Sequence, residues 1–130
     1  SLFDSFVLDN DTDGPIICNR DTFKLIYKLH LRRQQRCQEP FGLMSVDFEK
    51  EDKDIIIDTI YSNLRKGDLF CNWDKSSISI ILFKINLQGI RVIKRRLELL
   101  FSNYNLNNVE LKYTIVSNNE TDYNIEDVII

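Results

Sequence analysis

The sequence contains few of the residues from which nucleotide-binding loops and metal sites are built. Its 130 residues include only four glycines, two prolines and one histidine, His30. A phosphate-binding loop needs closely spaced glycines, and a structural zinc site needs four ligands drawn mostly from cysteine and histidine. We find no glycine-rich loop, no G-x-S-x-G motif and no cluster of metal ligands in the sequence. These absences argue against most enzyme classes and predict neither a cofactor nor a metal.

Cysteine is also scarce, and long apolar runs are missing. The three cysteines, Cys18, Cys37 and Cys71, are odd in number and lack C-x-x-C spacing. This pattern is typical of reduced thiols in a cytoplasmic protein rather than of a disulfide framework. No apolar run approaches the roughly 20 residues of a membrane-spanning helix, and no signal peptide is visible. We therefore expect a cytoplasmic protein that does not associate with membranes.

Excess positive charge is the third absence. The formal net charge is −3, with 43% hydrophobic and 28% charged residues, which is an ordinary balance for one globular domain. Nucleic-acid binding would need a basic face with interleaved aromatic side chains. The two basic clusters, Arg32/Arg33/Arg36 and Lys94/Arg95/Arg96, are short and are interpreted as solvated helix faces. We expect no nucleic acid as a partner of this domain.

Apolar periodicity divides the chain into an acidic lead-in, residues 1–14, and one domain, residues 15–130. The predicted helices run from a cap at Asp21 to about Gln35, over residues 49–65, and from a cap at Asn86 to about Ser102. The predicted strands are Leu43–Phe48, Leu69–Trp73, Ile78–Lys84 and Val109–Val116, and Val128-Ile129-Ile130 reads as an edge strand or a truncated continuation. This order predicts an α+β fold with a ferredoxin-like central antiparallel sheet and packed helices.

The stretch Arg65 to Lys84, RKGDLFCNWDKSSISIILFK, carries the most information about function. A short polar run lies between two apolar segments, and Asp74, Lys75 and Ser76 suit a turn, so the pattern predicts a β-hairpin. The second arm is apolar on both faces, which is typical of a strand in the middle of a covered sheet.

This stretch resembles the GGDEF domain, the diguanylate cyclase module of bacteria. In that family an R-x-x-D is followed by five residues and then by the GGDEF hairpin and an apolar strand. Here Arg65 and Asp68 match the R-x-x-D, and Asp74 to Ile78 occupy the five hairpin letters. Asn19 to Phe23 also resembles the N-R-x-x-F that opens the first helix of the family. The resemblance implies a GGDEF-like fold.

The matched catalytic positions have different chemistry. Asp74 and Lys75 replace the two glycines, and Ser76 and Ser77 replace the acidic residues of the hairpin. In the family, a D-x-D on the first strand helps to bind Mg²⁺; here Ser45 takes its first position and Asp47 its second. A serine hydroxyl cannot replace a carboxylate that neutralises Mg²⁺ and triphosphate charge. We therefore expect no cyclase activity, with Asp47 left as a strand-end carboxylate.

Arg65 and Asp68 have two interpretations. In active cyclases the R-x-x-D binds cyclic di-GMP, with the arginine on phosphate and guanine and the aspartate on a guanine edge. The alternative is a structural salt bridge between an arginine that ends a helix and an aspartate that begins the next strand.

The resemblance implies a non-catalytic regulatory or protein-interaction module of a bacterial signalling protein or transcriptional regulator. Its partner would be another protein, a neighbouring domain or a second copy of the chain. One alternative is a cyclic di-GMP receptor that binds through Arg65 and Asp68. Another is an unrelated ferredoxin-like binding domain.

Overall fold

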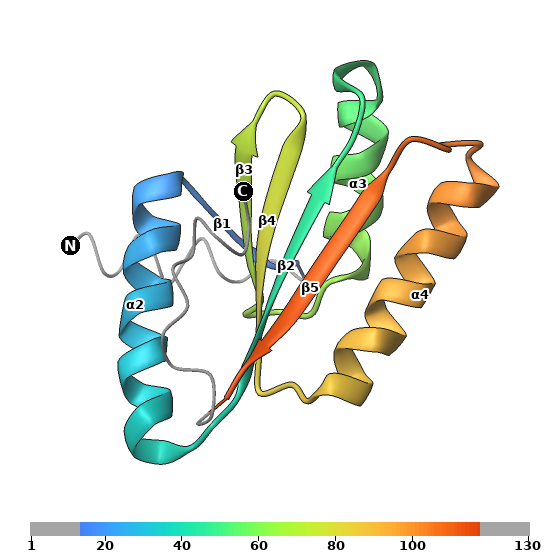
Figure 1. The fold of residues 1–130 in the computed structure, drawn as a ribbon. Helices are drawn as coiled ribbons and strands as arrows, with labels where there is room; N and C mark the ends of the chain where they lie inside the picture. Colours follow the sequence, from blue (N-terminus) through green and yellow to red (C-terminus); the bar gives the residue numbers. More distant parts are fainter. Residues whose placement is uncertain (1–13, 118–130) are drawn as a thin grey trace.

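The computed structural model describes residues 14–117 (Figure 1). The strands are β1 (Ile16–Cys18), β2 (Phe41–Asp47), β3 (Leu69–Asp74), β4 (Ser77–Phe83) and β5 (Glu110–Val116). The helices are α2 (Arg20–Cys37), the short 3₁₀ helix η1 (Lys50–Asp52), α3 (Lys53–Asn63) and α4 (Leu87–Asn103). Nearly all of the predicted lead-in, and the predicted strand Val128-Ile129-Ile130, lie outside the described residues.

The five strands form one sheet in the order β1-β3-β4-β2-β5. β2 pairs antiparallel with β4 and β5, and β3 pairs antiparallel with β4, so the predicted hairpin is confirmed. The predicted antiparallel sheet of four strands is therefore confirmed, and a fifth strand that was not predicted, β1, pairs parallel with β3 at one edge. β1 has three residues, too few to show the alternation by which a strand is recognised in a sequence.

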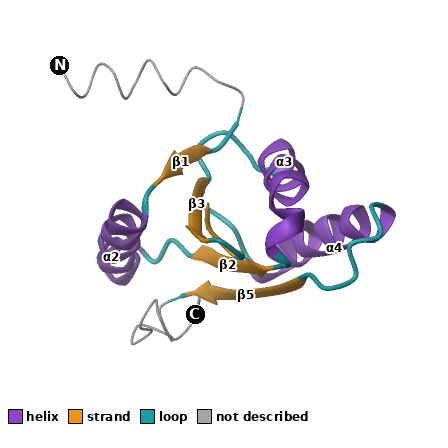
Figure 2. Cartoon of the chain, turned by 90° about the horizontal axis from the view of Figure 1, so that it is seen from above, coloured by secondary structure: helices purple, strands orange, loops and turns teal. Residues whose placement is uncertain are grey.

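Helices cover both faces of the sheet (Figure 2). α2 lies on one face, and α3 and α4 lie on the other. Side chains along β4 point alternately to the two faces of the sheet. Ile78, Ile80 and Leu82 belong to the core under α3 and α4, whereas Ile81 belongs to the core under α2. This explains why the sequence of β4 is apolar on both faces, as predicted for a central strand.

Side-chain caps fix the starts of the two long helices. The predicted cap of α4 is confirmed, because the Gly89 backbone N–H donates to the Asn86 side chain at 2.8 Å. The predicted cap of α2 is wrong. The Asn19 side chain, not Asp21, accepts from the Thr22 backbone N–H at 2.8 Å, since Asn19 has the extended backbone of a cap residue.

The second predicted helix is shorter than its apolar pattern suggests. It starts as η1, continues as α3 and ends at Asn63, so Arg65 lies beyond the helix. Leu64 has an extended backbone, and Gly67 has a φ of +95°, a conformation that favours glycine. This turn brings Arg65 back towards Asp68 at the start of β3. Within residues 14–117, no helix is long and apolar enough to cross a membrane.

Candidate functional site

The hairpin and the end of β2 bring the matched catalytic positions together at one end of the sheet (Figure 1). Asp47 pairs with Ser77 across β2 and β4, and Ser45 pairs with Ser79. The Phe48 backbone N–H donates to the Ser76 carbonyl at 2.9 Å, which ties the chain after β2 to the hairpin turn. These positions therefore share one location, as the resemblance implies.

The Asp74 side chain closes the hairpin turn. Its Oδ1 accepts a hydrogen bond from the Ser76 backbone N–H at 2.9 Å and another from the Ser77 hydroxyl at 2.8 Å. The bond from Ser76 is the main reason why the pKa of Asp74 lies below its ordinary value. Lys75 is exposed in the turn. The carboxylate of Asp74 thus stabilises its own loop.

Ser45 is enclosed in the protein. Its exposed fraction is 2%, and that of its neighbour Ser79 is 0%. Neither hydroxyl has a hydrogen-bond partner among the described residues. Ser45 lies two residues from Leu43, and Ser79 lies two residues from Ile81, and both of these apolar residues belong to the core under α2. Residues two apart on a strand point to the same face, so both serines face α2. An aspartate at position 45 would place a carboxylate inside this core.

Asp47 is the one carboxylate at a matched D-x-D position. Burial raises its pKa above the ordinary value, Lys112 opposes this shift, and the nearby charges of Glu110 and Asp74 add to it. In residues 14–117 no group of three histidine, cysteine or acidic side chains is arranged to hold a metal ion. The donors at this end of the sheet therefore do not fit the Mg²⁺ that the resemblance would require.

The R-x-x-D residues form an ion pair at the opposite end of β3. Asp68 is 2% exposed, and its carboxylate accepts from the Nε and Nη2 atoms of Arg65 at 3.2 Å each. It also accepts from the backbone N–H groups of Arg65, at 3.0 Å, and Phe83, at 3.4 Å. The Arg65 side chain is half exposed and donates to the Phe83 carbonyl at 2.6 Å. Both carboxylate oxygens of Asp68 therefore accept hydrogen bonds from groups of the protein itself.

A groove of about 550 Å³ opens beside Arg65, between the end of α3, the end of β4 and the start of α4. Its charged lining residues are Arg65, Lys84 and Arg96, and Asn63 and Asn86 add amide groups. No acidic side chain lines it. The groove therefore concentrates positive charge and hydrogen-bond donors, which suits an anionic ligand.

Two of these cations were missed in the sequence. Arg96 belongs to the basic cluster predicted as a solvated helix face, and Lys84 follows β4 with a φ of 50°. Arg65 and Arg96 are far apart in the sequence, so only the packing of α4 beside the end of α3 brings them to one groove. No local pattern could have indicated it.

His30 has a packing role. Its ring lies 4.4 Å from that of Phe83, centroid to centroid, and it is partly buried. Burial lowers the pKa of His30, and the nearby Arg33 charge acts in the same direction, against Glu39.

Comparison with known proteins shows similarity at the level of structure only. No family model and no curated protein matches the sequence. The GGDEF domain of FimX from Pseudomonas aeruginosa superposes with a TM-score of 0.71 at 10% identity, covering 86% of this chain and 82% of that one. The active GGEEF domain of a diguanylate cyclase from Vibrio cholerae gives 0.66 at 14%, covering 85% and 83%.

A third similar structure contains a nucleotide. The GGDEF domain of DgcB from Caulobacter crescentus, solved in complex with c-di-GMP, has a TM-score of 0.67 at 10% identity and covers 86% of this chain and 81% of that one. Together with the sheet order and the paired hairpin, these superpositions show that the described chain has the fold of a GGDEF diguanylate cyclase domain.

Proposed function

We propose that this GGDEF-fold domain is non-catalytic and acts as a regulatory or protein-interaction module of a bacterial signalling protein or transcriptional regulator. The observation that carries the proposal is the set of contacts made by the side chains of the hairpin turn and of β2. Asp74 is engaged by Ser76 and Ser77, and Ser45 is buried where a metal carboxylate would be needed. Two-metal phosphoryl transfer needs acidic ligands and a backbone that GTP can approach closely.

A direct assay tests the loss of catalysis. The chain would be incubated with GTP and Mg²⁺ or Mn²⁺, and the products separated by chromatography, with the Vibrio cholerae GGEEF domain as a positive control. We expect no cyclic di-GMP. Turnover that disappears in Asp47→Asn would show that β2 still supplies a catalytic carboxylate, and it would refute the proposal.

The exposed apolar side chains support a role in protein contacts. Leu25 and Leu29 are 57% and 53% exposed and lie four residues apart on α2, so they share one face of the helix. On α4, Val92 and Leu99 are 51% and 64% exposed. Such side chains suit contact with a neighbouring domain, another protein or a second copy.

Light scattering of the chain tests contact between two copies. We expect self-association that Leu25→Lys/Leu29→Lys weakens. A strict monomer at every concentration would contradict this contact.

The groove beside Arg65 favours a second candidate function, binding of cyclic di-GMP. Arg65, Lys84 and Arg96 offer three cations to a dianionic ligand. The aspartate of the R-x-x-D is not available for a guanine edge, because Asp68 is buried and its oxygens already accept from Arg65 and Phe83. Recognition would therefore depend on the three cations of the groove.

Calorimetric titration with cyclic di-GMP tests this candidate. The matched control is Arg95→Ala, because Arg95 is an exposed arginine on α4 that does not line the groove. If the groove binds the ligand, Arg65→Ala and Arg96→Ala should each weaken binding about tenfold or more, the effect of one charge-assisted contact, while Arg95→Ala changes little. Absence of heat in the wild type, or equal losses in all three variants, would reject it.

A further inference from the structure

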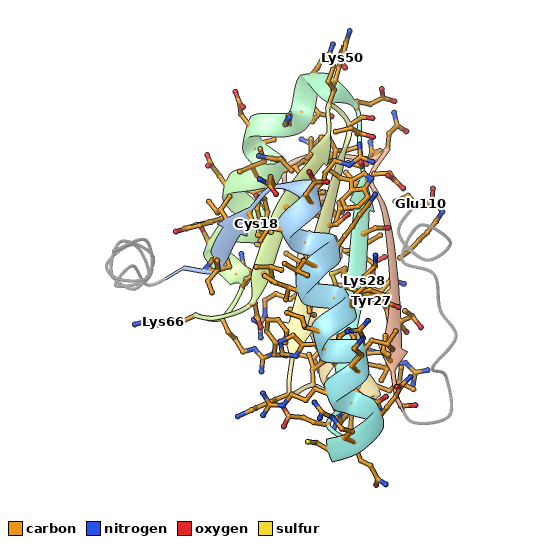
Figure 3. The ribbon with its side chains drawn as sticks, turned by 90° about the vertical axis from the view of Figure 1, so that its left-hand side faces the viewer. Cys18, Tyr27, Lys28, Lys50, Lys66 and Glu110 are labelled. Atoms are coloured by element: carbon orange, nitrogen blue, oxygen red, sulfur yellow. The ribbon has the colours of Figure 1, made fainter. Side chains whose placement is uncertain are left out.

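Cys18 and Cys71 occupy adjacent strands at the edge of the sheet. β1 and β3 are parallel, and Cys18 is the register partner of Cys71. Both side chains belong to the core under α2, where Cys71 is 0% exposed and Cys18 is partly buried. Figure 3 shows Cys18 on β1, beside the first turn of α2. The two thiols therefore lie on the same face of neighbouring strands.

This placement meets the main geometric requirement of a disulfide. Neighbouring strands lie about 4.7–4.9 Å apart, and disulfides join residues whose Cα atoms are about 4.4–6.8 Å apart. The remaining adjustment falls on β1, which has three residues and pairs with β3 alone in the described sheet. A short edge strand can shift more easily than a central one.

The two thiols influence each other's ionisation in the reduced protein. The neighbouring Cys71, followed by burial, raises the pKa of Cys18, whereas the neighbouring Cys18 lowers the pKa of Cys71. Burial works against ionisation of Cys71, and the Arg20 guanidinium favours it. Cys71 is enclosed and Cys18 is partly exposed, so Cys18 is the sulfur that a small oxidant can reach first.

We propose that Cys18 and Cys71 form a redox-active dithiol that a small hydroperoxide converts to an intramolecular disulfide. The partly exposed Cys18 sulfur attacks the peroxide, so an S–O bond forms and the O–O bond breaks, and the leaving oxygen departs as the alcohol with the proton of Cys18. The enclosed Cys71 sulfur then attacks the Cys18 sulfur, the S–O bond breaks, and hydroxide departs as water with the proton of Cys71. The two thiols lose two hydrogen atoms in total, and the peroxide is reduced to an alcohol and water.

The disulfide would fasten the start of α2 to the strand that enters the hairpin. In the reduced protein β1 is held by its three-residue ladder with β3, including the Ile16 backbone N–H bond to the Asp68 carbonyl at 2.8 Å. Asn19, which caps α2, directly follows Cys18. Oxidation would therefore suppress the opening of β1 away from the sheet. Oxidation of this dithiol would thus regulate the domain without catalysis and without a bound nucleotide.

The test compares the full chain with Cys18→Ser, Cys71→Ser and, as a matched control, Cys37→Ser, because Cys37 is exposed on α2 and has no cysteine opposite it. Each protein is treated with hydrogen peroxide, and its intact mass, tryptic peptides and thermal unfolding are measured without reductant. We expect Cys37→Ser to lose two hydrogen atoms in intact mass, and we expect both this variant and the wild type to yield a linked peptide pair containing Cys18 and Cys71. Their unfolding midpoints should rise by roughly 5–10 °C and return after treatment with dithiothreitol.

Two results would overturn the proposal. One is retention of free thiols at positions 18 and 71 under peroxide that oxidises Cys37. The other is addition of oxygen to these cysteines without a linked peptide. Cys18→Ser changes a partly exposed edge position, so it keeps the test valid even if Cys71→Ser does not fold.

Discussion

The guanidinium of Arg65 lies against the carboxylate of Asp68 through two nitrogen–oxygen contacts of 3.2 Å, and the two partners differ sharply in exposure. The Asp68 side chain is 3% exposed, whereas the Arg65 side chain is 50% exposed. Asp68 also accepts from two backbone N–H groups, so its role reaches beyond the ion pair.

This asymmetry predicts unequal effects of removing each partner. Asp68→Ala leaves the backbone N–H groups of Arg65 and Phe83 without the carboxylate that accepts from them, and should lower the free energy of unfolding by about 2–3 kcal/mol. Arg65→Ala removes a half-exposed charge and should lower it by only about 1 kcal/mol. Urea denaturation measures both, with Lys66→Ala as the exposed control. Equal losses from Asp68→Ala and Arg65→Ala would show that the pair acts as a simple salt bridge.

Asp74 should make the hairpin sensitive to acid. The pKa of Asp74 is lowered in the folded protein, mainly by the Ser76 backbone N–H. The contribution of Asp74 to stability is therefore fully present above the ordinary carboxyl pKa of 3.8, and it is lost as the pH falls through the lower pKa of the folded protein. Asp74→Ala should lower the free energy of unfolding by about 0.5–1 kcal/mol at pH 7. The difference from the wild type should shrink below about pH 4. A difference that stays constant between pH 7 and pH 3 would contradict this role.

Asp47 should show the opposite pH dependence. Burial raises its pKa in the folded protein, so the fold binds this proton more tightly than the unfolded chain does. The wild type should therefore lose stability as the pH rises from 3.8 through the folded pKa. Asp47→Asn should unfold at a higher denaturant concentration than the wild type at pH 7, and the gain should vanish at low pH. A loss of stability at pH 7 would indicate that the ionised carboxylate has a partner that stabilises it, such as Lys112.

Substitutions at the two buried serines, Ser79 and Ser45, should change the free energy of unfolding in opposite directions. Ser79→Ala removes a hydroxyl that has no partner among residues 14–117, and should raise the free energy of unfolding by about 1 kcal/mol. Ser45→Asp restores the carboxylate of the D-x-D pattern but places it in the core under α2, and should lower the free energy of unfolding by about 3 kcal/mol or more. Chemical denaturation at pH 7 checks both. Normal stability together with new metal binding in Ser45→Asp would show that this position can still be a ligand.

The sequence alone determined the elements with a strong local pattern. The apolar stripes of α2, α3 and α4 and the hairpin of β3 and β4 follow from periodicities of about 3.6 and 2 residues, which are properties of short segments. The spacing between Arg65, Asp68 and the hairpin was enough to indicate the GGDEF fold, which the superpositions show. The interpretation of Ser45, Ser76 and Ser77 as replacements of acidic family residues also came from the sequence, and it stays a prediction.

Other features of the protein depend on contacts between distant segments and are seen only in the folded chain. The parallel strand β1 exists because β3 offers it an edge, and three residues carry no periodic signal of their own. The sequence left Arg65 and Asp68 open between a ligand site and a salt bridge, and the burial of Asp68 against Phe83 shows an ion pair with further backbone donors. The groove with Lys84 and Arg96, and the pairing of Cys18 with Cys71, join residues that are distant in sequence. Such sites arise from the packing of the sheet and its helices, which no local pattern encodes.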